Sequence, residues 1–176
     1  RGVGTTADAH RIVFDGTNDY ITFPGVTNTF TAFTVDWWIY PSTRTDFNQQ
    51  ITASGSWGQF ACHTASAGGM YCGTDAGNRF TPVELPGNTL VTSQWQHFAF
   101  VYTGTVGRFY KNGAQVGSDK AMNAPVAWTG FQLGTNSTSS IDGGIGRAAV
   151  YNLGLSTSEI SQNCKASAYR YGVTCN

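Results

Sequence analysis

The sequence predicts an all-β fold, either a sandwich or a barrel of short strands. Aromatic residues make up 14 % of the 176 positions and charged residues only 11 %, against about 25 % charged residues in an average globular protein. The 22 glycines supply tight turns, and Thr, Val, Phe, Tyr and Trp suit half-buried pleated surfaces. Short runs of these residues recur with turn signals between them, as they do in sandwich and barrel proteins.

Three strands are predicted in the N-terminal part of the chain. They cover residues 11–14, 20–23 and 33–40, and they end at Asp15-Gly16, Pro24-Gly25 and Pro41. Side chains alternate across a strand, so one face of the third strand is predicted to enter the core. That face consists of Phe33, Val35, Trp37 and Ile39.

The other face of residues 33–40 is mixed, because it combines Thr34 and Asp36 with Trp38 and Tyr40. Such a face suits either contact with a ligand or cover by a neighbouring loop.

The middle of the chain contains three shorter predicted strands and then one clear antiparallel unit. The short strands cover residues 49–52, 59–62 and 69–72, and a stretch punctuated by Gly and Pro follows them. The antiparallel unit consists of strands at 95–102, 106–111 and 114–117. Asn112-Gly113 predicts a two-residue turn between the last two, since a type I′ turn needs φ > 0 at both central residues. In this unit Trp95 is assigned to the core and His97 to a structural role.

The C-terminal part predicts strands at 131–134 and 145–151, followed by one short helix. Ser156-Thr157-Ser158-Glu159 has the form of a capping box, with Ser156 as the N-cap and Glu159 at the third helical position. A helix start at Ser158 stays open as an alternative. Ile160, Cys164 and Ala168 then recur at four-residue spacing and form an apolar stripe.

Composition also excludes some classes of protein. The net charge is zero, with ten acidic and ten basic residues and no basic run, so nucleic-acid binding is not expected. No apolar stretch approaches the ~20 residues that cross a bilayer, so membrane insertion is not expected either. The absence of a repeat, a linker or a second composition predicts a single domain over residues 1–176. Because the chain begins at Arg1, we expect a processed product or a fragment.

Four cysteines allow three disulfide pairings. The simplest is Cys62–Cys72 with Cys164–Cys175, since each bond closes a short loop and the first pair flanks a predicted hairpin. Two disulfides would place the protein in an oxidising compartment. Four free, buried thiols remain an alternative. A zinc site is disfavoured because no C-x-x-C pair occurs.

Several segments resemble laminin-G-like domains of the concanavalin A-like lectin/glucanase superfamily, in the same order. They are residues 13–21, 33–41, 95–102, 109–117 and 144–160. The resemblance implies a two-sheet antiparallel jelly-roll sandwich with one short C-terminal helix. The tail 166–173 is similar to the ending of such domains in microbial and phage proteins. Members of the superfamily include carbohydrate-binding modules, adhesion domains, some glycosidases and phage structural proteins, so the fold alone does not give the function.

Catalysis is not expected. Glycoside hydrolysis needs two carboxyl groups about 5 to 10 Å apart. The only glutamates are Glu84 and Glu159, and neither has a second acid within five residues. A hydrolytic triad also lacks a Gly-x-Ser-x-Gly elbow.

A calcium site is a second hypothesis, suggested by the resemblance. Asp15 and Asp19 match the first half of the site that relatives often carry, and Asp142 could complete it. Where relatives often have Ile-Asp-Glu, this chain has Ile145-Gly146-Arg147, whose positive charge could replace a cation. The competing interpretation of the two N-terminal aspartates is turn formation, in which Asp binds its own backbone.

Sugar binding uses aromatic faces together with a few placed polar groups. The candidate ligand contacts are residues of predicted loops or of the mixed face: Trp38, Tyr40, Trp57, Tyr71, Arg79, Trp128 and Asn136. Trp57 and Trp128 are included because they lie among turn residues, although loop tryptophans often pack under their own loop. Asn136-Ser137-Thr138 also fits the N-glycosylation acceptor pattern.

The sequence therefore favours a non-catalytic carbohydrate-binding or adhesion module, secreted or displayed on a surface, with a glycan or cell-surface polysaccharide as its partner. The alternative is a structural or assembly protein, such as a virion decoration subunit or a surface-filament component, whose partners would be copies of itself or a larger assembly. A glycosidase is the third hypothesis.

Overall fold

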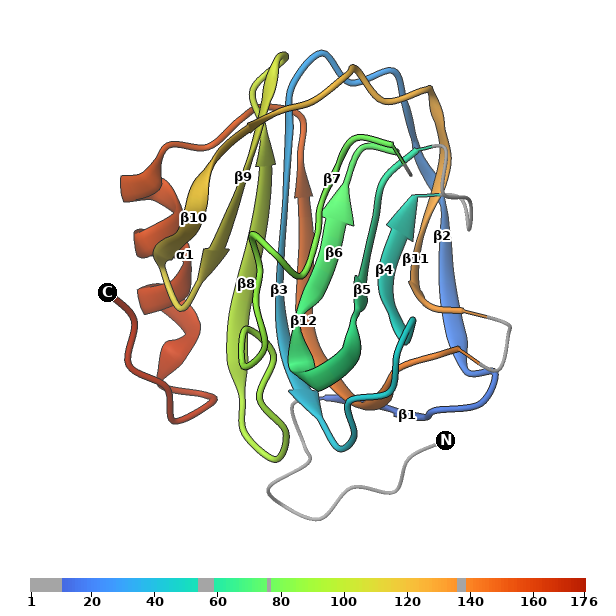
Figure 1. The fold of residues 1–176 in the computed structure, drawn as a ribbon, viewed down its shortest axis with the longest axis vertical. Helices are drawn as coiled ribbons and strands as arrows, with labels where there is room; N and C mark the ends of the chain where they lie inside the picture. Colours follow the sequence, from blue (N-terminus) through green and yellow to red (C-terminus); the bar gives the residue numbers. More distant parts are fainter. Residues whose placement is uncertain (1–10, 54–58, 76, 136–138) are drawn as a thin grey trace.

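The computed structural model describes residues 11–53, 59–75, 77–135 and 139–176. In these residues two antiparallel sheets of six strands lie face to face, and a single helix follows the last strand (Figure 1). The chain is thus a two-sheet sandwich with a short C-terminal helix, as the sequence predicts.

Sheet A contains the strands that come first and last in the chain. In spatial order they are β1 (Ile12–Asp15), β12 (Asp142–Tyr151), β3 (Phe33–Pro41), β8 (Gln96–Tyr102), β9 (Val106–Lys111) and β10 (Ala114–Ala121). The turn between β9 and β10 consists of Asn112 (φ 49°) and Gly113 (φ 85°). Positive φ at both positions confirms the predicted Asn-Gly hairpin.

Sheet B contains the remaining strands. In spatial order they are β2 (Tyr20–Asn28), β11 (Trp128–Gly134), β4 (Gln49–Ala53), β5 (Ala61–Thr64), β6 (Met70–Gly73) and β7 (Arg79–Phe80). A 3₁₀ turn, Ser66–Gly68, joins β5 to β6. Several strand bounds differ from the prediction. The strand β2 continues past Pro24, and the short edge strand β7 lies within the stretch that was predicted to be irregular.

The core between the sheets is rich in aromatic side chains. Phe33, Val35, Trp37 and Ile39 are fully buried there, which confirms the predicted inner face of β3. Trp128 lies in the same core, with its ring 4.7 Å from that of Phe30 and 5.0 Å from that of Phe33.

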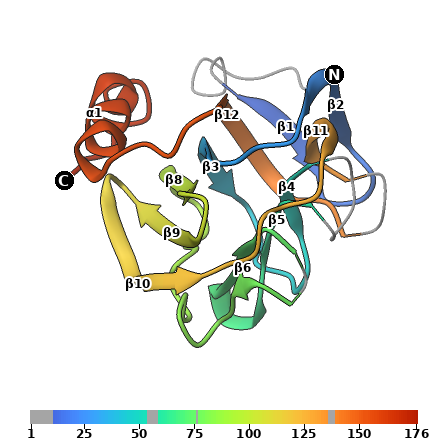
Figure 2. The same ribbon diagram turned by 90° about the horizontal axis from the view of Figure 1, so that it is seen from above.

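The helix α1 (Thr157–Ala168) covers the outer face of sheet A. Figure 2 shows it on the side of this sheet that faces away from sheet B. The predicted capping box is confirmed, because the Ser156 side chain accepts from the Glu159 backbone N–H and the Glu159 carboxylate accepts from the Ser156 N–H. The stripe of Ile160, Cys164 and Ala168 is buried.

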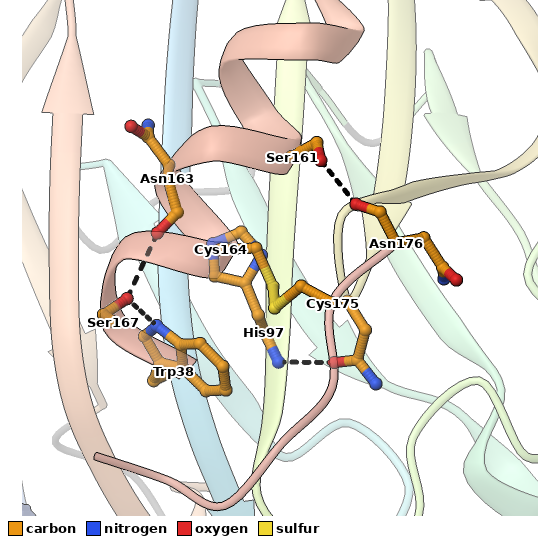
Figure 3. The surroundings of a disulfide bond; sticks show 9 residues. Trp38, His97, Ser161, Asn163, Cys164, Ser167, Cys175 and Asn176 are labelled. Carbon is orange, nitrogen blue, oxygen red and sulfur yellow. Dashed lines mark hydrogen bonds between the residues drawn. A yellow bond between two sulfur atoms is a disulfide. The ribbon is translucent and has the colours of Figure 1, made fainter. Parts of the chain in front are cut away.

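The C-terminal tail closes the cover over β3. Tyr171 stacks on Trp38 with ring centroids 4.3 Å apart. The Trp38 indole N–H donates to Ser167 Oγ at 2.8 Å (Figure 3). Trp95 is half-buried against Tyr171 in this outer cluster. Its assignment to the central core is therefore corrected, because it precedes β8 instead of alternating within it.

Both predicted disulfides are present. Cys62–Cys72 joins directly opposed residues of β5 and β6, and Cys164–Cys175 ties the tail to α1. None of the described helices is long and apolar enough to cross a membrane.

Candidate functional site

A row of side chains crosses the outer face of sheet B from its middle toward the edge at β7. In the strand register Gln49 lies opposite His63, and His63 lies opposite Tyr71. Directly opposed residues of an antiparallel pair project to the same face. The row therefore carries an amide, an imidazole and a phenol side by side. Phe47 and Arg79 flank it, and we call these five residues the aromatic cluster.

The rings of the aromatic cluster are nearly parallel. The planes of Phe47 and Tyr71 differ by 8°, with centroids 6.1 Å apart. His63 lies 5.4 Å from Phe47 and 4.8 Å from Tyr71, and its plane is within 23° of both. The side chain of His63 is fully buried while that of Phe47 is exposed. The two outer rings therefore rest on the imidazole and turn apolar surface to solvent.

The exposure of Phe47 is unusual, since 55 % of this large apolar residue faces solvent. Its backbone also has φ 63°, a left-handed conformation that is rare for bulky residues. The Phe47 N–H donates to the Thr64 carbonyl at 3.0 Å. The Asn48 N–H donates to the Thr64 hydroxyl at 3.0 Å, and that hydroxyl donates to the Thr45 carbonyl. One residue of β5 thus fixes the loop that presents Phe47.

His63 acts as a neutral ring in this arrangement. Burial is the main cause that lowers its pKa to about 4, and the positive charge of Arg79 adds to the effect. Its Nδ1 lies 3.1 Å from the Thr64 carbonyl oxygen, which therefore accepts the ring N–H. The imidazole supports the outer rings and is uncharged near neutral pH.

Arg79 brings a positive charge to the edge of the cluster. Its guanidinium carbon lies 4.4 Å from the centre of the Tyr71 ring, a cation–π contact. Arg79 lies opposite Gly73 in the β6–β7 pair, and a Cβ at Gly73 would collide with the backbone of Arg79. The preceding turn is fixed by Asp75, whose carboxylate accepts from the N–H groups of Gly77 and Asn78. Gly73 and the turn at Asp75 thus allow the short strand β7 to lie close to β6.

The structure therefore brings together two of the sequence-predicted ligand contacts, Tyr71 and Arg79. Tyr40 lies elsewhere, on sheet A, against Trp95 and the guanidinium of Arg11. Trp57 and Asn136, with the glycosylation pattern 136–138, lie outside the described residues.

Two predicted contacts are corrected. Trp38 is fully buried under α1 and the tail, and Trp128 is 2 % exposed within the central core. Neither offers a ring face to a ligand. The mixed face of β3 is covered, and Trp128 begins the strand β11 instead of lying in a loop.

Sequence reasoning missed Phe47, Gln49 and His63. A polar stretch surrounds Phe47, and no periodic pattern marks an apolar residue there as exposed. The register that places Gln49 beside His63 includes a bulge between Gln49 and Ile51. An isolated phenylalanine among Asp, Asn and Gln was the one available signal.

The three aspartates of the calcium hypothesis lie near one another at the end of β1. Asp15 lies opposite Asp142 in the β1–β12 pair. The Asp15 carboxylate accepts from the Thr17 N–H at 2.8 Å, and the Asp19 carboxylate accepts from the Asp15 N–H at 3.0 Å. Within the described ranges there is no group of three His, Cys, Asp or Glu residues suited to hold a metal ion. Asp15 and Asp19 thus make the turn contacts expected of the competing interpretation, and the calcium hypothesis stays a prediction.

Arg147 of β12 forms an ion pair with Asp36 of the neighbouring strand β3. Its guanidinium lies 2.6 Å from Asp36 and donates to the Tyr151 hydroxyl, and Asn163 of α1 donates to the second Asp36 oxygen. Burial raises the pKa of Asp36, and the charge of Arg147 opposes that effect. The network links β3, β12 and α1, so Arg147 has a structural partner.

The two glutamates are also engaged in structural contacts. Glu84 forms an ion pair with Lys120 and accepts from the Thr81 N–H at 2.8 Å, while Glu159 caps α1. The two residues lie on different parts of the fold, in the loop after β7 and at the start of the helix.

Comparison with known proteins adds the following. A family model described as the concanavalin A-like lectin/glucanases superfamily matches residues 15–161. No curated protein sequence matches the chain.

Solved structures with the same fold come from several organisms. Domain 4 of AbnA, a GH43 extracellular arabinanase from Geobacillus stearothermophilus in complex with arabinotriose, is 17 % identical with a TM-score of 0.65, over 86 % of this chain and 75 % of that one. A heptameric SAP-like pentraxin from Limulus polyphemus is 17 % identical with a TM-score of 0.67, over 92 % and 84 %. A putative carbohydrate binding protein from Bacteroides ovatus is 19 % identical with a TM-score of 0.62, over 86 % of this chain and 47 % of that one. At such identities the likeness concerns the fold.

Proposed function

Because the chain belongs to the concanavalin A-like lectin/glucanases superfamily, we propose that it is a non-catalytic carbohydrate-binding module and that the aromatic cluster on sheet B contacts the sugar. The observation that carries the proposal is the exposed ring of Phe47, held nearly parallel to Tyr71 by a buried histidine. A left-handed conformation is unfavourable for phenylalanine, and more than half of the residue stays in contact with solvent. Unusual backbone conformations of this kind cluster at ligand sites.

The chemistry of the aromatic cluster suits a sugar ring. Aromatic faces offer apolar surface to the C–H face of a pyranose or furanose, and nearby polar groups orient its hydroxyls. The Gln49 amide can both donate and accept, and the Arg79 guanidinium donates in a fixed geometry. An apolar platform with an amide on one side and a guanidinium on the other matches a ligand that is apolar on one face and hydroxylated at its rim.

Three lines of support for the lectin role come from outside the site. The similar arabinanase domain is in complex with arabinotriose, and another similar protein is described as carbohydrate binding. Both glutamates have structural partners, which favours binding over hydrolysis. The two disulfides favour an oxidising compartment, and hence secretion or surface display.

The test is a glycan array followed by titration of variants. Phe47→Ala, Tyr71→Ala and Arg79→Ala should each weaken binding about tenfold or more, because truncating a central aromatic or arginine contact is costly. The chain supplies a matched control, since Arg170 contacts the ring of Tyr169 on the opposite side of the fold and that tyrosine is 76 % exposed. Tyr169→Ala and Arg170→Ala should leave binding unchanged.

Two results would contradict the proposal. One is a bound glycan whose affinity does not respond to any of the three cluster variants. The other is the absence of binding to every glycan tested, together with self-association in light scattering, which would support the structural or assembly role instead.

A further inference from the structure

A long apolar groove runs along one open edge of the sandwich, between β12 of sheet A and β2 of sheet B. It consists of two hollows, of about 320 and 430 Å³, which share Val26 and Val150. The first is lined by Ile12, Phe23, Val26, Phe131, Leu133, Ile145, Gly146, Ala148 and Val150. The second is partly polar, because Thr27, Asn28 and Asn152 line it together with Phe30 and Tyr151. The groove thus follows β12 from Ile145 to its end.

The floor of the groove belongs to the central core. Leu133, Phe131 and Ile145 are at most 4 % exposed there. The walls are more open, since Ile12 is 44 % and Phe23 is 41 % exposed. Core side chains that form the floor of an open channel indicate a place where no strand covers the edge of the sandwich.

The edge of β12 explains why the groove is open. The strand β1 pairs only with Asp142–Ile145, while β12 continues to Tyr151. On that side, residues 146–151 have no strand partner among the described residues. Their backbone N–H and C=O groups form a free edge, which is a template for another strand.

The opposite edge of the groove is less suited to pairing. The strand β2 contains Pro24, which lacks an N–H group, and its register against β11 shifts between Thr129 and Phe131. Proline and bulges are the features by which natural edge strands avoid pairing. The free edge of β12 contains no proline. An added strand would therefore pair with β12, and its side chains would pack against β2 and β11.

The chain segment that precedes β1 does not match the groove chemically. Ten residues come before Arg11. Asp8 and His10, at alternate positions in the sequence before Ile12, are both polar. Desolvating a histidine and a carboxylate in an apolar channel is unfavourable.

We propose that the groove binds an extended apolar segment of a partner polypeptide, which adds to sheet A as a strand antiparallel to β12. Main-chain hydrogen bonds to residues 146–151 would provide affinity, and alternate apolar side chains would fill the first hollow, which is lined by apolar residues. The free edge corresponds to a segment of about six residues, at ~3.3 Å per residue. This surface lies on a different part of the fold from the aromatic cluster, so it is independent of the proposed sugar site.

The test uses a fluorescent synthetic peptide that alternates threonine and valine, together with two N-methylated versions. One version is methylated at the valine amides and the other at the threonine amides. Successive N–H groups of a strand point to opposite sides, so only one set faces β12. We expect saturable binding that one methylation pattern weakens about tenfold or more, through lost backbone hydrogen bonds, and that the other leaves unchanged.

Variants of the protein locate the binding. Val150→Glu and Val26→Glu place a charge in the groove and should abolish peptide binding, while thermal unfolding checks that each variant folds. Val83→Glu is the matched control, because Val83 is 88 % exposed outside the groove. Phe47→Ala should have no effect on the peptide.

Three results would overturn the proposal. Equal affinity for both methylated peptides would indicate apolar binding without strand pairing. Binding that is insensitive to Val150→Glu and Val26→Glu would place the peptide elsewhere. Binding that appears only after deletion of residues 1–10 would show that the chain's own N-terminal segment occupies the groove.

Discussion

Acidification should destabilise the fold through His97, which is buried under α1 next to Trp38. The residue is fully buried, and neither ring nitrogen has a hydrogen-bond partner among the described residues. Its ring lies 5.2 Å from that of Trp38 (Figure 3). Burial, with a further contribution from the charge of Arg147, lowers the pKa of His97 to about 3.

The sign and size of the effect follow from this pKa. An unfolded histidine titrates near 6.5, so as the pH falls the unfolded chain binds the proton first. The contribution of His97 is therefore complete above pH 6.5 and is lost as the pH falls toward its folded pKa. At pH 6.5 the unfolded histidine is already half protonated, so the contribution of His97 to the unfolding free energy falls by about 2.3 kcal/mol between pH 6.5 and 4.5. His63, whose pKa is about 4, should lose a similar amount over the same window.

Urea unfolding at pH 6.5 and 4.5 measures this loss. This window ends at the ordinary pKa of glutamate, so the ion pairs of Glu84 and Asp119 lose only about 0.5 kcal/mol together within it. His97→Phe should remove about half of the wild-type pH dependence, and His63→Phe should remove much of the rest. The reasoning is refuted if His97→Phe keeps the full wild-type dependence, or if the His97 ring titrates above pH 5 in NMR spectra of the folded protein.

Three further predictions concern the C-terminal cover and the cation hypothesis. Replacing Cys164 and Cys175 together by Ser should lower the free energy of unfolding by about 3 kcal/mol in urea titrations, as expected for a bond that closes a short loop; an unchanged midpoint would contradict this. Ser156→Ala should cost about 1 kcal/mol in the same assay through loss of the helix cap, and no measurable cost would mean that the capping box contributes nothing. Glycan binding should be the same in calcium and in EDTA, whereas loss in EDTA would restore the cation site at Asp15 and Asp19.

Local patterns predicted most of the fold. The alternation in residues 33–40 identified the buried face of β3, and Asn112-Gly113 identified a hairpin, because both depend on geometry within a few residues. The continuation of β2 past Pro24 could not be predicted in this way. Pro24 lies on the edge strand of sheet B, within the irregular stretch between Phe23 and Thr27, and both an edge and a bulge tolerate proline.

The candidate site was less predictable, because its members meet only through strand pairing. Tyr71 and Arg79 were each predicted to bind ligand, but their contact depends on the two-residue strand β7. Trp38 was ambiguous in sequence, since a mixed face can be a ligand surface or a docking surface. In the structure α1 and the tail pack over Trp38, so this face is a docking surface. The packing involves a distant part of the chain, and the local sequence of β3 therefore cannot predict it.

The contacts of Thr64 with the Phe47 loop have a consequence for how ligands compete. Because the backbone of the loop is already bonded to β5, a ligand orders little of the protein when it binds. The entropy that is lost on association is then mostly the ligand's own. Of two oligosaccharides with the same contacts, the one with the stiffer glycosidic linkages should bind more tightly. The site would therefore select sugars by their rigidity as well as by their hydroxyl pattern.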